Sequence, residues 1–259
     1  LKNADDKAQA LFDNCFKILD GPEAPDLTIQ EGNNELMIYL SNKPSSNNYL
    51  NSYAEKDVTI LGQPGYTVSC LANPDQFYRF EGYKVYQLKD GTVSQTDVDD
   101  PTKAKLVFQC DVKNGVSRLI NYNYDGSVAA DVPSVKVEGA DEGISTTFKV
   151  TEDVFATGAN KKLVNNKTYY FMAFAYAYNN YATYKQDQSP TVEPCVNYFG
   201  QKRPYLEGRK VKKAAGIPHL TSVEYDGTIT QSNYGYGPKI KRIEGQGNGG
   251  NVMDLTDET

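Results

Sequence analysis

Short runs in which apolar and polar residues alternate constrain the fold of this chain more than any other feature. The longest run is 167–179 (KTYYFMAFAYAYN), and a second strong run at 77–89 ends at Asp90-Gly91. A period of two places successive side chains on opposite faces of a β-strand. Further strands are expected at 26–30, 35–41, 104–112, 116–124, 134–138, 144–150 and 191–199. Short strands separated by turn residues at intervals of about 8–12 residues are typical of a β-sandwich.

One helix is expected before the strands begin, at 4–19. Its apolar residues recur at helical spacing, and Gly21-Pro22 follows its end. The polar stretch 42–75 indicates a long insertion between strands. Because the chain begins at Leu1 and stops inside an unfinished element, we expect it to be a fragment of a longer polypeptide. The expected regions are 1–24 (helix and linker), 25–200 (a β-sandwich with insertions) and 201–259 (a connector and the start of a second module).

Composition narrows the function classes. The 259 residues contain 27 Lys and Arg against 33 Asp and Glu, so the net charge is −6. An acidic chain lacks the general basic character of a nucleic-acid-binding protein. His219 is the single histidine, which excludes a cluster of histidines for catalysis or metal binding. No apolar run approaches the 18 residues of a membrane span, and no motif is catalytic, so we expect a non-enzymatic protein.

Four cysteines, Cys15, Cys70, Cys110 and Cys195, are spaced widely and form no CxxC pair. This spacing argues against a zinc ribbon or a thioredoxin-like redox site. Four cysteines allow three disulfide pairings, between which the sequence does not choose. Buried free thiols are the alternative, because a free cysteine packs as a small apolar residue.

Three segments carry a resemblance to a known family: Leu163 with Tyr169 six residues later, the segment 81–86, and Leu36 with Ile38. They resemble the sixth, third and second strands, respectively, of the fibronectin type III family. The resemblance implies an all-β, fibronectin III- or immunoglobulin-like sandwich in which the Tyr169 hydroxyl bonds back to the chain near the turn. The chain departs from the family in having no tryptophan and in its longer middle region.

Five segments are similar to parts of large secreted proteins of Bacteroidota. They are FEGYKVYQL (80–88), QCDVKNGVS (109–117), AYAYN (175–179), KRPYLEGRK (202–210) and IEGQGNGGN (243–251). Such proteins have many domains and are often exported by the type IX secretion pathway. The resemblance therefore implies an extracellular or outer-membrane-associated location on the cell surface.

Two groups of residues are candidate ligand sites. Large side chains on the second face of 167–179 would form an aromatic ridge for a glycan or a partner chain; they are Tyr170, Phe174, Tyr176 and Tyr178. The alternative is that the helix, the insertions or the tail cover this face. Asp97, Asp99 and Asp100 offer oxygen ligands for Ca²⁺, the one cofactor considered, although the segment lacks the pattern of an EF-hand loop and a solvated acidic turn is the simpler explanation.

The sequence thus favours a non-catalytic structural and interaction module of a secreted or cell-surface protein. Its partners would be neighbouring domains of the same polypeptide or other cell-surface proteins, with no nucleic acid. Two alternatives remain open, namely a glycan-binding accessory module that uses the aromatic face and a non-catalytic part of a larger secreted enzyme.

Overall fold

The computed structural model describes residues 2–16, 19–61, 73–184 and 200–221. Residues Leu1–His219 belong to one compact unit. The described part of the chain is all-β with one α-helix, α1 (Lys2–Asp13). The strands are β1 (Asp26–Gly32), β2 (Glu35–Ser41), β3 (Ala54–Lys56), β4 (Phe77–Leu88), β5 (Ala104–Asp111), β6 (Arg118–Asp125), β7 (Ala130–Glu138), β8 (Thr147–Val150), β9 (Tyr169–Tyr178), β10 (Tyr205–Glu207) and β11 (Lys213–Gly216). Short 3₁₀ turns lie at Tyr49–Asn51 and Gln95–Asp97.

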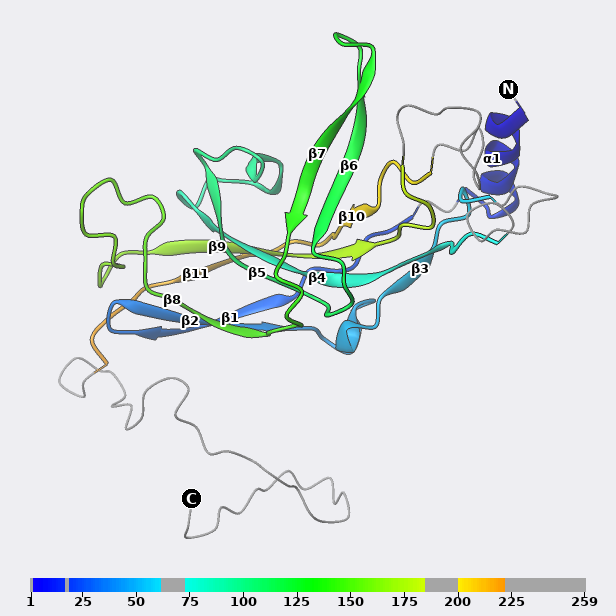
Figure 1. Cartoon of the computed structure of the whole chain (residues 1–259). Helices are drawn as coiled ribbons and strands as arrows, with labels where there is room; N and C mark the ends of the chain where they lie inside the picture. The colour runs from blue at the N-terminus through cyan, green and yellow to red at the C-terminus, as the bar shows by residue number, and fades with distance from the viewer. Residues whose placement is uncertain (1, 17–18, 62–72, 185–199, 222–259) are drawn as a thin grey trace, which may run out of the picture. The chain divides into compact units, whose positions relative to one another are not determined.

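The strands form three antiparallel sheets (Figure 1). A three-stranded sheet has the order β1-β2-β8, and β6 and β7 form a two-stranded hairpin. The largest sheet has the order β10-β9-β4-β3, and β5 also pairs with β4. The edge of β9 opposite β4 pairs with two short strands: β10 pairs with the C-terminal end of β9, and β11 pairs with its N-terminal half.

The main core lies between the three-stranded sheet and the largest sheet. Inward-facing residues of β2 and β8, such as Leu36, Ile38 and Phe148, pack with Val85 of β4 and Phe171 of β9. The clean alternation of buried and half-buried residues along β2 follows from this arrangement, since only one of its faces is covered.

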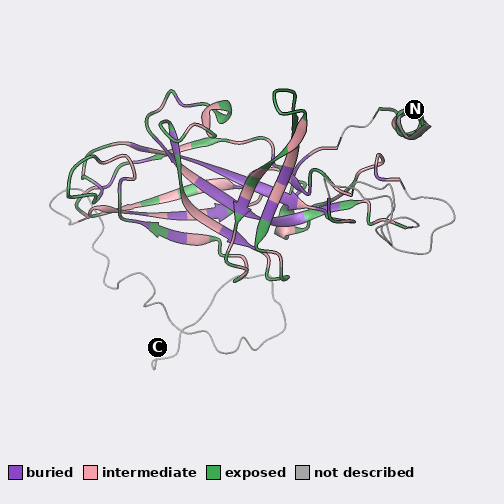
Figure 2. Cartoon of the chain, turned by 45° about the horizontal axis from the view of Figure 1, so that its top comes forward, coloured by how far each residue is buried: buried purple, intermediate pink, exposed green. Residues whose placement is uncertain are grey.

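The outer face of the largest sheet is covered as well (Figure 2). Leu119 and Val137 of the β6–β7 hairpin pack on Tyr176 together with Tyr205 of β10. A second cluster places Val93, from the segment between β4 and β5, in the group that contains Phe174. Strands β4 and β9 are therefore buried on both faces, which is why their large side chains are not restricted to alternate positions.

Several expected elements differ from the structure. The helix ends at Asp13 instead of residue 19, and positive φ angles at Cys15 and Phe16 follow it. Phe12 and Phe16 are exposed, so this helix buries no apolar stripe there. Strands β10 and β11 follow residue 200 and yet pair with β9, so the largest sheet includes part of the expected connector. The strand expected at 191–199 lies outside the described residues.

Candidate functional site

The central side chains of the expected aromatic ridge are buried and not exposed to solvent. Phe174 and Tyr176 have 2% and 0% of their surface exposed, and Tyr170 and Tyr178 are half-buried. A ridge that binds a glycan needs accessible ring faces, so the sequence-based interpretation of this face as an exposed site is wrong for its two central rings. The physical reason is that the β6–β7 hairpin, an insertion between β5 and β8, packs on Tyr176, and that Val93 from the segment between β4 and β5 packs in the cluster of Phe174.

A buried lysine, Lys84, lies on this covered face of the sheet. Lys84 of β4 is 5% exposed, and its Nζ lies 4.6 Å from the ring centroid of Tyr205, 5.8 Å from that of Tyr176 and 5.9 Å from that of Tyr86. Burial lowers the pKa of Lys84 to about 8, and the nearby Glu207 carboxylate opposes this change. Sequence reasoning missed this lysine because alternation along a strand presents a polar residue as solvent-facing.

A cavity of about 400 Å³ adjoins Lys84. Its lining comes from β4, β7, β9, β10 and the segment around the Gln95–Asp97 turn; it includes Lys84, Tyr86, Val98, Asp99, Ser134, Val135, Lys136, Phe174 and Glu207. The cavity therefore lies between the largest sheet and the hairpin that covers it.

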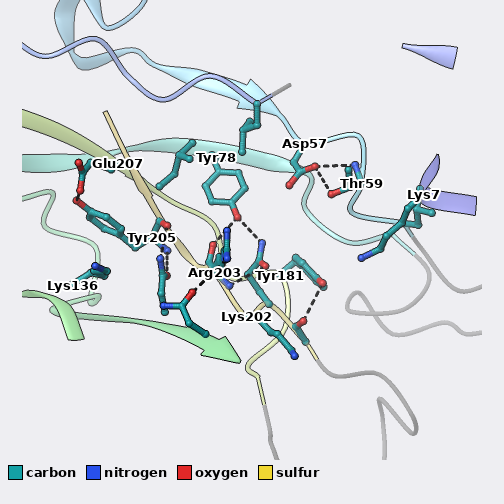
Figure 3. Close-up of a pocket in the computed structure, with 17 residues that line it drawn as sticks. Lys7, Asp57, Thr59, Tyr78, Lys136, Tyr181, Lys202, Arg203, Tyr205 and Glu207 are labelled. Atoms are coloured by element: carbon teal, nitrogen blue, oxygen red, sulfur yellow. Dashed lines mark hydrogen bonds between the residues drawn. The ribbon is translucent and has the colours of Figure 1, made fainter. Parts of the chain in front are cut away.

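A larger cavity of about 770 Å³ is shown in Figure 3. The residues that line it include Lys7, Asp57, Thr59, Tyr78, Asn121, Asn123, Lys136, Tyr181, Gln201, Lys202, Arg203, Tyr205 and Glu207. They are contributed by segments far apart in the sequence, from β4, the β6–β7 hairpin and the chain around β10.

Hydrogen bonds fix the wall of this larger cavity. The Tyr78 hydroxyl donates to the Arg203 carbonyl oxygen at 2.7 Å and accepts from the Gln201 amide at 2.8 Å. The Asn121 side chain bonds both backbone groups of Tyr205, donating to its oxygen and accepting from its nitrogen at 3.0 Å each. Two segments 84 residues apart are thereby joined by a pair of buried bonds.

Cations outnumber anions around the larger cavity, although the whole chain is acidic. Lys136, Lys202 and Arg203 line it together with the carboxylates of Asp57 and Glu207. Lys202 is engaged, because its Nζ lies 2.6 Å from Asp131 Oδ2. The Arg203 guanidinium reaches the Asn123 amide oxygen at 3.4 Å and retains further donors. Amides, cations and hydroxyls of this kind can hold a polar or anionic ligand.

Two of the three aspartates considered for calcium have other partners, and the third lines a cavity. Asp97 accepts hydrogen bonds from Lys103 Nζ at 2.6 Å and from Ser94, and these bonds lower its pKa. Asp100 accepts from the backbone and hydroxyl of Thr102, and Asp99 lines the cavity beside Lys84. Among the described residues, no group of three His, Cys, Asp or Glu side chains is arranged to hold a metal ion.

Two further buried carboxyl groups lie near the base of the hairpin. Glu81 is 3% exposed and accepts hydrogen bonds from Asn114 Nδ2 at 3.0 and 2.9 Å. Asp111 is also buried, and its Oδ1 accepts from the Asp141 backbone at 3.0 Å. Burial raises the pKa of both groups, to about 7 for Glu81.

The residues assigned a structural role are placed as follows. The Tyr169 hydroxyl accepts a hydrogen bond from the Val164 N–H at 2.9 Å, which is a bond back to the chain of the kind that the resemblance implied, and Leu163 is buried in the main core. Cys15 is an exposed free thiol and Cys110 a buried one. Cys70 and Cys195 lie outside the described residues.

No α-helix in the described segments is long and apolar enough to cross a lipid bilayer. Comparison with known proteins gives no further guide: no protein-family model matches the chain, and no curated protein or solved structure is similar to it.

Proposed function

We propose that this chain is a fibronectin III-like, non-catalytic structural and interaction module of a secreted or cell-surface protein with several domains. The observation that carries the proposal is the strand order. One sheet has the order β1-β2-β8, and the other places β9 between the edge strands β10 and β11 and the pair β4-β5. In immunoglobulin-like sandwiches, two antiparallel sheets likewise pack face to face, with the third, sixth and seventh strands together in one of them.

The turn before β9 supports the same assignment. The bond from Val164 N–H to the Tyr169 hydroxyl is a tyrosine corner of the kind found in immunoglobulin-like sandwiches. Asn34, in the turn between β1 and β2, donates to the Leu163 carbonyl oxygen at 2.7 Å. The hydrogen bond between Asn34 and Leu163 therefore joins the two sheets at one end of the module.

The β6–β7 hairpin is the part of the module best suited to contact other proteins. Figure 1 shows it extending away from the sheets. Tyr124, Val128, Val132 and Val135 leave large parts of their apolar surface exposed along it. Exposed apolar side chains that gather on one element favour a protein contact over a solvated surface. The occupant proposed here is a neighbouring domain of the same polypeptide or another cell-surface protein.

A photo-cross-linking experiment tests the interaction role. A benzophenone amino acid replaces Tyr124 in the full polypeptide on its native cell, and the matched control places it at Lys161, an exposed residue outside the hairpin. The proposal expects one defined cross-linked product from the hairpin position, lost when excess unlabelled chain competes. Equal or diffuse cross-linking from both positions would overturn it.

The proposed location is extracellular or on the cell surface, and export by the type IX pathway is part of the proposal because of the sequence resemblance given above. Antibody detection after fractionation of the native cell checks this directly. Recovery of the protein in the medium or the outer-membrane fraction is expected, whereas recovery in the cytoplasm alone would contradict it.

A second candidate function is glycan binding, which the larger cavity favours over the enclosed aromatic face. Asn123, Gln201, Lys136 and Arg203 supply amide and cationic donors there. Such donors suit the hydroxyl and carboxylate groups of an acidic saccharide. Binding to acidic glycans on an array, weakened by Arg203→Ala and retained by the exposed control Lys161→Ala, is expected; no binding across the array would remove this candidate.

A further inference from the structure

The ammonium of Lys84 is held without an ion pair. Within the described residues, no carboxylate oxygen lies within 4.0 Å of its Nζ, and its one hydrogen bond is a long one of 3.5 Å to the Lys136 carbonyl oxygen. Most buried lysines are paired, because an unpaired buried charge is costly. Lys84 is therefore a buried amine that the packing of the module leaves without a strong partner.

The surroundings favour the neutral amine more than an exposed site would. The rings of Tyr86, Tyr176 and Tyr205 stabilise the ammonium through cation–π contacts. Burial acts in the opposite direction and is the stronger influence, lowering the pKa of Lys84 to about 8. A substantial fraction of Lys84 is then uncharged at pH 7.5, whereas an exposed lysine with a pKa of about 10.4 is almost fully protonated.

The amine also adjoins enough space for a ligand. The cavity of about 400 Å³ is lined by Lys84, Tyr86 and Phe174 on the sheet side and by Ser134 and Lys136 on the hairpin side. This volume falls within the range of about 300–1,000 Å³ that is usual for small-molecule sites. The remaining charged groups in its lining are Asp99, from the segment after the Gln95–Asp97 turn, and Glu207 of β10.

We propose that Lys84 is a covalent binding site for a small, polar carbonyl compound that enters this cavity and forms an imine with Nζ. A desolvated lysine outside an ion pair is the kind of amine that forms Schiff bases with carbonyl ligands. Asp99, Lys136 and Glu207 surround the ligand position with groups that hydrogen-bond to hydroxyls, so a hydroxy-aldehyde fits better than an apolar one.

The reaction is balanced without an oxidant or a reductant. The lone pair of the neutral amine forms a bond to the carbonyl carbon, and the carbonyl π electrons move to the oxygen, which takes up a proton as the nitrogen loses one. The resulting carbinolamine loses its hydroxyl and the second amine proton as water. The product is a C=N bond to Nζ, and hydrolysis reverses the step.

Reductive trapping in the full chain tests this site. The probe is glycolaldehyde with cyanoborohydride at pH 7.5, and peptide mass spectrometry locates the reduced adduct. Lys84 is expected to be modified at least tenfold faster than the exposed Lys161, because a far larger fraction of the Lys84 amine is neutral at this pH. The rate at Lys84 is expected to rise with a midpoint near pH 8. A rate equal to or below that of Lys161, or a rate that rises only above pH 10, would overturn the proposal.

Two comparisons show whether the cavity is responsible. Ser134→Phe fills the cavity from β7 and is expected to lower Lys84 labelling about tenfold, whereas Ser127→Phe in the hairpin turn leaves it unchanged. In concentrated urea, where the cavity is lost, Lys84 is expected to react no faster than Lys161. Unchanged labelling in a folded Ser134→Phe protein, or the same ratio of rates in the native and the urea-unfolded chain, would contradict the proposal.

Discussion

Replacing Glu81 with glutamine is expected to stabilise the protein above pH 7 and to leave it almost unchanged near pH 4.5. The carboxyl group of Glu81 is buried, and its bonds from Asn114 only partly compensate for lost hydration. Burial raises its pKa from an ordinary 4.5 to about 7, and the charges of Asp111 and Asp141 act in the same direction. Glutamine keeps an oxygen that accepts from Asn114 while removing the charge.

The sign follows from proton linkage. Between pH 4.5 and 7 the folded state binds a proton at Glu81 that the unfolded chain has released, so the free energy of unfolding falls as the pH rises. The contribution is complete below pH 4.5 and is lost as the pH passes through about 7. Since one pKa unit corresponds to 1.36 kcal/mol, the loss is about 3 kcal/mol.

Urea unfolding at pH 4.5, 6 and 8 measures the effect as the difference between Glu81→Gln and the parent chain. The difference is expected to grow from near zero to about 3 kcal/mol in favour of the variant, with an unchanged dependence on urea. The control Glu152→Gln replaces an exposed glutamate and is expected to change the free energy by less than about 0.5 kcal/mol at each pH. A Glu81→Gln difference that is the same at pH 4.5 and 8, or a variant less stable at pH 8, would refute the reasoning.

Three further outcomes are expected. Tyr169→Phe removes the hydroxyl that accepts a backbone N–H bond and should lower the free energy of unfolding by about 1 kcal/mol in urea titrations, with no loss meaning that the corner is not stabilising. Gly82→Ala should destabilise by about 1–3 kcal/mol, because the new Cβ would lie 2.2 Å from the Cys110 carbonyl oxygen, whereas Gly126→Ala meets no atom within 4 Å; equal melting temperatures for the two would contradict this. Treatment with EDTA should leave the melting temperature unchanged, because Asp97 already bonds a lysine; a clear fall would restore the calcium hypothesis.

The local pattern was sufficient to predict the strands that form the centre of the fold. Strand β4 at Phe77–Leu88 and strand β9 at Tyr169–Tyr178 lie within the segments expected from alternation. The hydroxyl bond of Tyr169 was expected from the resemblance to the fibronectin type III family. For the two strands, the signal lies within a short stretch of sequence, where period determines the geometry.

Both cavities depend on contacts that no local pattern contains. Alternation along β4 presents Glu81, Lys84 and Gln87 as polar positions, yet all three are buried. Gln87 donates to Asp153 and accepts from the Val154 N–H in the segment between β8 and β9, and Glu81 accepts from Asn114. Lys84 is buried because the β6–β7 hairpin and the chain around β10 cover the outer face of the sheet. That cover depends on bonds such as those between Asn121 and Tyr205, which are 84 residues apart. Sequence periodicity reports which face of a strand is polar and says nothing about what distant segment lies on it.

Glu81 and Lys84 are buried charged residues that packing alone does not require, so they bear on the function of this fold more than on its stability. Both charged groups are removed from water. The carboxylate that most counteracts the lowered pKa of Lys84 is Glu207 at the cavity, and not Glu81 three residues away. Apolar residues of similar volume at such positions usually give an equal or greater free energy of unfolding. A module selected only to space other domains has no physical reason to keep a lysine there. Its position beside a partly open cavity of about 400 Å³ is therefore better explained by a ligand than by the packing of the sheet.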